Sequence, residues 1–594
     1  MRTGLTSVAQ AIISSLRKSE VSWLIEVDRT GDGVVDDYWA KKTKSYDGHD
    51  YTFKIISMGT VSLQRNQSEK DLIAGSEFTF KISNPGNTLH PSDFEDGNVT
   101  LKLVIKADID VPSGSGATVN FFPDSFFPQG FFPDSFFPYS TGPDEIEVED
   151  TVLSWSFDIE SVVPGQQELE FRCCDWLKKY LKGTYPNTPM ITHLWPTLER
   201  DKYACVPVTF GTPYIPLAAL ATADEFHYVL GPADESYTIY EARTPSEWSA
   251  NHIKWSAATF DFIVTPKIGF NGDSYDTFQL IGADTDNDLI PDRNVVLQDG
   301  DFILSLATKF CRNSSQSTTN PIYIVDRILR DFGVPANKID TVTRDATASS
   351  LDDRNLTWDF GIWYYEDREA LLARLLNMCQ CEIIPRDKIY FKLHSPTSQR
   401  NIGRSDVLRI VNGRGVPSIQ GDAHFSYDPL TIERKDSGYV QFQYANTPID
   451  KLQEILVSTY EMTDNISDTK VRADYIQDVS NAMKIGALTL QRILWPEANV
   501  SVNCLGTLLE IECDDIVTIT PDEYGAGTGR EYKILIDKIE ITEDLEVSIT
   551  GTKFIRDLSG WNDLEPIPVS QFLGQDISYG YKYVVHGPDS PGAS

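Results

Sequence analysis

The sequence predicts a mainly β, multidomain protein with an α+β module in its middle. Apolar and polar residues alternate with a period of two along much of the chain, as in half-buried strands; Trp23, Ile25 and Val27 are one example. The spacing becomes helical between residues 320 and 379. The chain has 594 residues, and chains of this size divide into domains of roughly 50 to 200 residues.

The first domain is expected at residues 1–165. Gly, Asn and Asp separate its alternating runs, which favours an antiparallel sandwich or barrel. The expected strands include Phe78, Phe80 and Ile82; Leu101, Leu103 and Ile105; and Leu153, Trp155, Phe157 and Ile159. An amphipathic helix is expected before them, with Leu5, Val8, Ile12 and Leu16 on one face. Polar residues interrupt that helix, whereas a signal peptide needs an unbroken apolar centre.

Four regions follow this domain. We expect a second β-rich domain at 166–300, beginning with a short helix from Cys174 to Lys182. A helix-containing α+β module is expected at 301–435, and a β domain with one helix at 436–560. Residues 561–594 lack clear periodicity and are expected to form a C-terminal arm that orders against a neighbour.

The middle module opens with a well-marked helix. Pro321 stands at its first position and Gly333 at its stop, and Ile324, Ile328 and Phe332 share one face. A second helix is predicted from Glu366 to Cys379, and the chain then turns into the strand Ile389–Leu393. Packing residues dominate this module, and they form no catalytic constellation.

This order of elements resembles the hub proteins of bacteriophage tails, the baseplate-hub or tail-tip attachment family. In that family an Asn-Pro, a helix, a Gly, a variable loop, an acidic helix and a strand lie between β domains. Other phrases of the sequence agree with the resemblance: 205–217, 440–444, a helix around Tyr475 to Leu494, and 508–517. The chain has Asp514-Asp515 where the family usually has Gly-Asp.

The resemblance implies tube-like β domains and a mechanical role. It implies a homotrimer at the distal end of a phage tail, with two tube-like domains per subunit forming a pseudo-sixfold ring. Such a hub joins the tail tube to tip or fibre proteins and forms or gates the DNA exit channel. The implied partners are the distal tail or tail tube protein, the tape measure protein and tip or fibre proteins. The implied location is the virion, after synthesis in the host cytoplasm, with host attachment through the tip.

Charge and cysteine content restrict the function further. The net charge is −35, and affinity for phosphate backbones comes from clustered Lys and Arg, so specific nucleic-acid binding is not expected. The same negative charge would let DNA slide past the surface without adhering, and it would equally serve to keep the protein soluble. The eight cysteines form no CxxC pair and are interpreted as buried small hydrophobic residues in a reducing cytoplasm.

A pentapeptide repeat of the form Phe-Phe-Pro-x-x marks an insertion at 107–145. Proline at every fifth position excludes a regular helix and a central strand. Burying each phenylalanine contributes roughly 1.5 to 3 kcal/mol, so we expect something to cover the loop. Three possibilities remain open for what covers the loop: its own or a neighbouring subunit, a host membrane, or no partner at all. The eight residues of this interaction loop are Phe121, Phe122, Phe126, Phe127, Phe131, Phe132, Phe136 and Phe137.

Two aspartate-rich loops are candidate calcium sites, and no other cofactor is indicated. The first has oxygen ligands at alternating positions and Gly33 at the sixth, as in an EF-hand loop, but Trp39 replaces the final Glu. It also reads as a hairpin turn. The second resembles thrombospondin-type calcium loops, although Leu289 replaces a Gly, and a solvated loop is the alternative. The candidate ligands are Asp28, Thr30, Asp32, Asp36, Asp284, Asp286, Asp288 and Asp292.

Catalysis is not expected from this sequence. The histidines stand apart from any Cys or Ser signature, and the glycine-rich stretch 525–529 lies between strands, where a hairpin tip is expected in place of a phosphate cradle. Two alternatives to the tail hub stay open: a secreted calcium-dependent β-sandwich adhesin, and a tail-associated cell-wall hydrolase.

Overall fold

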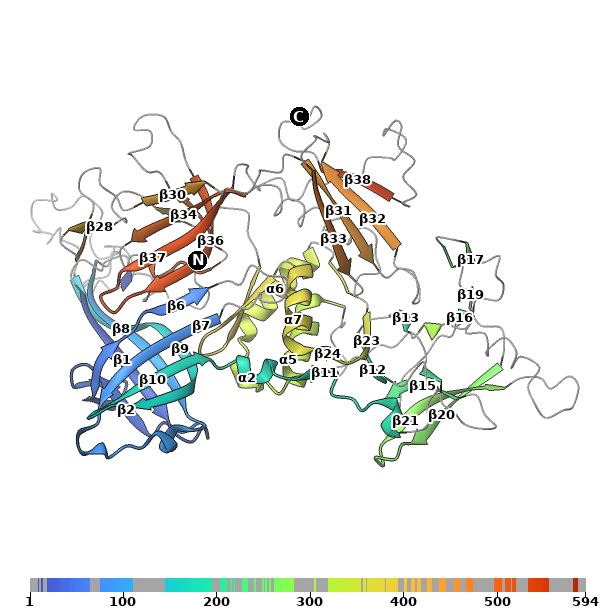
Figure 1. Ribbon diagram of the computed structural model, residues 1–594, viewed down its shortest axis with the longest axis horizontal. Helices are drawn as coiled ribbons and strands as arrows, with labels where there is room; N and C mark the ends of the chain where they lie inside the picture. Colours follow the sequence, from blue (N-terminus) through green and yellow to red (C-terminus); the bar gives the residue numbers. More distant parts are fainter. Residues whose placement is uncertain are drawn as a thin grey trace, which may run out of the picture.

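The structure is a computed structural model of the whole chain. It describes residues 19–64, 75–110, 145–194, 203–210, 261–281, 319–353, 356–358, 360–379, 381–393, 508–513, 515–519 and 532–554, together with residues 9, 12 and 13 and the shorter strands named below. The prediction of a mainly β protein with an α+β middle module is confirmed (Figure 1). Within the described residues no helix is long and apolar enough to cross a membrane.

One large sheet dominates the fold. Its central ladder joins β1 (Ser19–Asp28), β8 (Asn98–Asp110), β9 (Glu145–Pro164) and β10 (Glu168–Asp175), each antiparallel to the next. The sheet continues through β7 (Gly75–Ser83) to β6 (Val61–Gln64). At its other side lie β2 (Asp37–Ala40), β4 (His49–Phe53) and β3 (Lys44–Tyr46), while β5 (Ile55–Met58) pairs with β7.

Strands from the C-terminal part of the chain complete this sheet. β6 pairs antiparallel with β36 (Tyr532–Ile541), for example Leu63 with Ile539. From β36 the sheet runs on through β37 (Val547–Phe554) and β34 (Pro496–Cys504) to β30 (Phe425–Pro429). β35 (Ile516–Ile519) pairs with β36 and with β27 (Arg400–Ile402). The residues predicted as separate β regions at the two ends of the chain therefore share one sheet (Figure 1).

The side chains of both regions also share one hydrophobic core. Phe80 and Phe171 stack in it, with 4.7 Å between their ring centroids, and the Trp39 ring packs against both at a tilt. Ile536 and Ile549 from the C-terminal strands belong to the same cluster, as do Ile12 and Ile13 of the helical N-terminal residues. Alternation therefore identified the buried positions correctly, and burial of this apolar surface stabilises the joined sheet.

The helical body lies beside the sheet and has its own core. It contains α2 (Lys178–Leu181), α5 (Pro321–Asp331), α6 (Thr341–Asp353), α7 (Arg368–Cys379) and the hairpin of β25 (Cys381–Pro385) and β26 (Ile389–Leu393). Asn320 caps α5 by accepting the Ile322 N–H at 3.0 Å, and Gly333 at its end has a φ of +99°, a conformation that favours glycine. The predicted start and stop of α5 are confirmed.

Three helix predictions need correction. Cys174 lies in β10, and the short helix is α2 alone, because the ladder with β9 continues to Asp175. Glu366 and Asp367 form β24, paired with β11 (Thr184–Tyr185), so α7 begins two residues later than predicted. The predicted variable loop contains α6. The sequence of this helix has few apolar residues, so its apolar periodicity is too weak to predict a helix. The helix predicted around Tyr475 to Leu494 lies outside the described residues.

The remaining strands form small sheets. β12 (Ala204–Phe210) pairs with β23 (Phe360–Tyr364), and β14 (Ala218–Ala219), β15 (His227–Pro232), β21 (Ser274–Ile281) and β20 (Asp261–Ile268) form a second sheet. β33 (Ile466–Ala473), β31 (Ser437–Tyr444), β32 (Gln453–Thr459) and β38 (Tyr581–Val585) form a third. Two-stranded pairs are made by β13 (Tyr214–Ile215) with β22 (Leu304–Ser305), β16 (Tyr240–Glu241) with β19 (Ser256–Ala257), β17 (Trp248–Ser249) with β18 (His252–Ile253), and β28 (Leu408–Val411) with β29 (Arg414–Pro417).

Candidate functional site

The hairpin β25–β26 connects the large sheet to the helical body. The carbonyl oxygen of Arg386, in its turn, accepts the Trp176 Nε1–H at 2.6 Å and the Ser156 backbone N–H at 3.3 Å. Lys338 Nζ donates to the Asp387 carbonyl oxygen at 3.1 Å. Ser156 belongs to the large sheet, whereas Trp176 follows β10 and lies in the core of the helical body, and Lys338 also lies in that body. We call this hairpin, together with residues 508–513 and 515 that pack on it, the junction.

Buried ion pairs hold the junction together. Arg386 pairs with Glu512, and their side chains are 8% and 4% exposed. Lys392 Nζ lies 2.8 Å from an Asp515 carboxylate oxygen and donates to the Cys513 carbonyl oxygen, also at 2.8 Å. Arg400 adds a more exposed pair with Glu510 at 2.5 Å. Each pair links the segment around the hairpin to residues more than a hundred positions later.

Burial and pairing act in opposite directions on these charges. Burial alone would lower the pKa of Lys392, but the carboxylates of Asp515, Glu512 and Glu382 outweigh it and raise the pKa. Burial alone would raise the pKa of Asp515, and the Lys392 ammonium reverses this effect. The raised Lys392 pKa stabilises the fold below pH 10.5, and the lowered Asp515 pKa stabilises it above pH 3.8. The pair is therefore charged throughout the neutral range.

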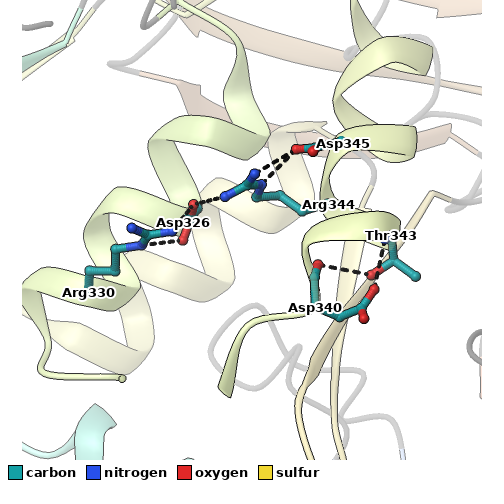
Figure 2. A network of polar contacts seen from close by, with 6 residues as sticks. All are labelled: Asp326, Arg330, Asp340, Thr343, Arg344 and Asp345. Carbon is teal, nitrogen blue, oxygen red and sulfur yellow. Dashed lines mark hydrogen bonds and ion pairs between the residues drawn. The ribbon is translucent and has the colours of Figure 1, made fainter. Parts of the chain in front are cut away.

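A second network fixes α5 against α6 (Figure 2). The Asp326 carboxylate accepts hydrogen bonds from Arg330 Nε at 2.8 Å and from Arg344 Nη1 at 2.7 Å. Arg344 also pairs with Asp345 at 2.8 Å and covers the Tyr323 ring. Asp340 accepts the Thr343 N–H at 2.8 Å and so caps the start of α6. Asp326 is thus shared between its own helix and the next one.

Removal of Arg344 should destabilise the helical body. We expect Arg344→Ala to lower the free energy of opening of α5 by about 2 to 3 kcal/mol, because Arg344 is only 14% exposed and is the cation that joins the buried Asp326 carboxylate to α6. Arg330→Ala is the matched control; its side chain is 40% exposed, so its loss should change that free energy by less than about 1 kcal/mol. Amide hydrogen exchange in 321–331 measures both, and equal effects would contradict the assignment.

The first predicted calcium loop is present as a tight turn after β1. The Asp28 carboxylate accepts the N–H groups of Thr30, Gly31 and Gly33 at 3.2, 2.7 and 2.7 Å. Asp36 accepts the Arg29 N–H at 2.8 Å, and Asp32 accepts the Val34 N–H at 2.8 Å. Backbone amides therefore contact all three carboxylates. Across the described residues, no group of three or more His, Cys, Asp or Glu side chains is arranged to hold a metal ion.

The other predicted site residues lie outside the described residues. These are the second calcium loop, with Asp284, Asp286, Asp288 and Asp292, and the interaction loop from Phe121 to Phe137. The described strands β8 and β9 lead to the interaction loop, and their last paired residues are Asp110 and Glu145.

The sequence analysis missed the charged residues of the junction. A signal for them exists: Glu382 and Lys392 each stand between apolar neighbours in short apolar runs, where a charged side chain needs a partner. Glu512, the partner of Arg386, and Asp515, the partner of Lys392, lie in the stretch 508–517. Sequence alone does not show which cation meets which carboxylate.

Comparison with known proteins gives only structural neighbours. No family model and no curated protein matches the sequence. Among solved structures, a protein of the virion of a native gene transfer agent particle is 10% identical, with a TM-score of 0.40 over 64% of this chain and 91% of that one. The 43 kDa tail protein of prophage MuSo2 from Shewanella oneidensis is 7% identical, with a TM-score of 0.37 over 89% and 98%.

A tail protein from Neisseria meningitidis is also similar, at 9% identity and a TM-score of 0.36 over 91% of this chain and 98% of that one. All three structures are named as virion or tail proteins, and all three TM-scores are below 0.5.

Proposed function

We propose that this chain is a structural hub protein at the distal end of a phage tail. The observation that carries the proposal is the junction: buried ion pairs and hydrogen bonds to backbone oxygens join the sheet, the helical body and residues 508–513 and 515 at one place. A buried pair tolerates little change of geometry, because separating its charges leaves each one desolvated and alone. Such a junction suits a part that must keep its shape under load.

The proposed assembly is a homotrimer whose tube-like domains form a ring on the tail tube. It joins the tube to the tape measure protein and to tip or fibre proteins, and it forms or gates the DNA exit channel. A chain with a net charge of −35 would give this channel an acidic wall on which DNA slides without adhering. DNA is then a passing molecule and not a specific ligand. The five-part division predicted from the sequence belongs to the same proposal, with strands of its first and fourth parts in one sheet.

Electron microscopy of the purified protein, alone and with the tail tube protein, tests the proposal. We expect threefold rings that seat on the end of the tube. A protein that stays monomeric and shows no contact with the tube would overturn the hub function. A ring whose lumen is lined mainly by Lys and Arg would leave the hub intact and reject the acidic channel.

We propose that the Phe-Phe-Pro loop is an interaction loop at the tip. The proposal is supported by the ladder of β8 and β9, whose last paired residues, Asp110 and Glu145, flank the insertion in the sequence. Its chemistry suits contact with neighbouring copies or with the host envelope. Deletion of 111–144 should leave the core sheet folded; loss of rings would assign the loop to assembly, and loss of infection alone would assign it to the host.

Calcium binding by the aspartate loops stays a proposal and has a direct test. If a loop binds, saturating calcium at about 100 times the Kd should stabilise the fold by roughly 2.7 kcal/mol and raise the Tm. Asp28→Asn with Asp32→Asn should remove the effect of the first loop, and Asp286→Asn with Asp288→Asn that of the second. Metal analysis runs in parallel, and an unchanged Tm with no bound calcium rejects both loops.

A further inference from the structure

Asp175 is a buried carboxyl group at the link between the large sheet and the helical body. It is the last residue of β10, paired with Phe157 of β9, and it is 1% exposed. Its Oδ1 accepts the Leu177 N–H at 2.8 Å. Among the described residues, its Oδ2 is buried and has no hydrogen-bond partner. A buried oxygen without a partner tolerates the neutral acid far better than the anion.

The residues after Asp175 anchor the helical body. Trp176 and Leu177 are buried in its core, and Trp176 also bonds to the junction through Arg386. Arg368 of α7 donates to the Tyr180 carbonyl oxygen at 3.0 Å and so holds α2 from the other side. The segment 175–177 is therefore a short covalent link between two cores.

The charges around this link do not neutralise Asp175. Lys178 forms an ion pair with Glu77 at 3.9 Å, and Lys179 forms one with Asp158 at 3.4 Å. Lys338 lies over the Trp176 ring and bonds to the Asp387 carbonyl oxygen. The charged groups on the elements packed against the link are Glu77, Asp158, Lys178, Lys179, Lys182, Lys338, Arg386 and Asp387.

We propose that Asp175 is a pH-dependent release point: its ionisation loosens the segment 175–182, and with it the attachment of the helical body to the sheet. The geometry supplies the reason, since an anion here would face a dry environment with one amide donor. Opening of the segment exposes the carboxylate to water and removes this penalty. The inference holds for the isolated chain and does not depend on the tail function.

The direction of the pH effect follows from two pKa values. Burial raises the pKa of Asp175 from 3.8 to about 7; the Leu177 N–H and Lys178 lower it, and Asp158 raises it further. In the opened segment the carboxyl group returns to its ordinary value. The closed form therefore gains stability as pH falls from about 7 toward 3.8, and above about 7 its disadvantage is constant.

Hydrogen exchange of peptide 171–185 in the wild-type protein tests the proposal. After correction for intrinsic exchange, the opening equilibrium constant should rise roughly tenfold from pH 5 to pH 6 and level off above about pH 7. Asp175→Asn keeps an oxygen acceptor for the Leu177 N–H and carries no charge, so its profile should be flat. Glu168→Gln, a half-exposed carboxylate on the same strand, should keep the wild-type slope.

Two results would overturn the release point. One is a flat wild-type profile, which decides the matter even if Asp175→Asn fails to fold. The other is an unchanged slope in a folded Asp175→Asn variant. The amides of Leu371–Cys379, a stretch without carboxyl groups, are the internal reference. An equal rise in that stretch would assign the effect to global unfolding and not to the link.

Discussion

Arg386→Met is expected to lower the free energy of opening of the junction by about 3 to 5 kcal/mol. The substitution keeps an apolar stem over the Tyr390 ring, which Arg386 now covers at 4.5 Å. It removes the cation that faces Glu512, a carboxylate with a side chain only 4% exposed. Glu512 would keep most of its desolvation penalty, with Lys392 as the remaining cation near it, and this penalty explains the size of the effect.

The double variant Arg386→Met/Glu512→Met separates this penalty from lost packing. With both charges gone, stability should return to within about 1 kcal/mol of the parent, since apolar replacements of buried pairs are often neutral. Arg400→Met is the comparison variant, because the Arg400 side chain is 33% exposed and water can reach its pair with Glu510, so its effect should be smaller than that of Arg386→Met. Hydrogen exchange in 381–393 measures the stability of the junction in each variant. A double variant as unstable as Arg386→Met would contradict the assignment of the effect to the unpaired Glu512 charge.

Phe171→Ala should destabilise the large sheet by about 3 to 5 kcal/mol. Phe171 is completely buried, stacks on Phe80 at 4.7 Å and meets Phe94 edge-on at 5.0 Å. Truncation removes these contacts and leaves a cavity that the surrounding strands cannot fill. Because Ile536 and Ile549 belong to the same core, the loss should extend to the C-terminal strands.

Thiol labelling of Cys173, read by mass spectrometry, measures this effect, because Cys173 is buried two residues away in the same strand. Labelling in mild urea should become faster in Phe171→Ala, and less so in Phe171→Leu. Phe270→Ala is the control, since that ring is 78% exposed and should alter labelling hardly at all. An equal response of Phe171→Ala and Phe270→Ala would show that this core does not limit the opening of β10.

Local rules predicted much of the fold. Alternation identified Trp23, Ile25 and Val27 as one buried face of β1, and all three are in the core. Pro321 and Gly333 delimit α5 as the capping rules require. These signals are short-range, so a single sequence carries them in full.

Long-range pairing was not predictable in the same way. The pairing of Leu63 with Ile539 depends on which edge strands meet, and many edges have the same alternating pattern. The partners Arg386 and Glu512 are likewise one choice among many cations and carboxylates in an acidic chain. Asp175 lies within the helix predicted from Cys174 to Lys182, whereas in the structure it is buried as the last residue of β10.

The pairing of β6 with β36 has a consequence for biosynthesis. Cys513 Sγ reaches the Leu63 carbonyl oxygen across 450 positions of the chain. Translation proceeds at about 5 to 20 residues per second, so β6 emerges from the ribosome roughly half a minute to a minute and a half before its partner exists. During that interval an unsatisfied strand edge faces solvent and offers a pairing site to other nascent copies. Completion of the sheet by the chain's own late strands closes that edge, so a chain truncated before residue 532 should aggregate.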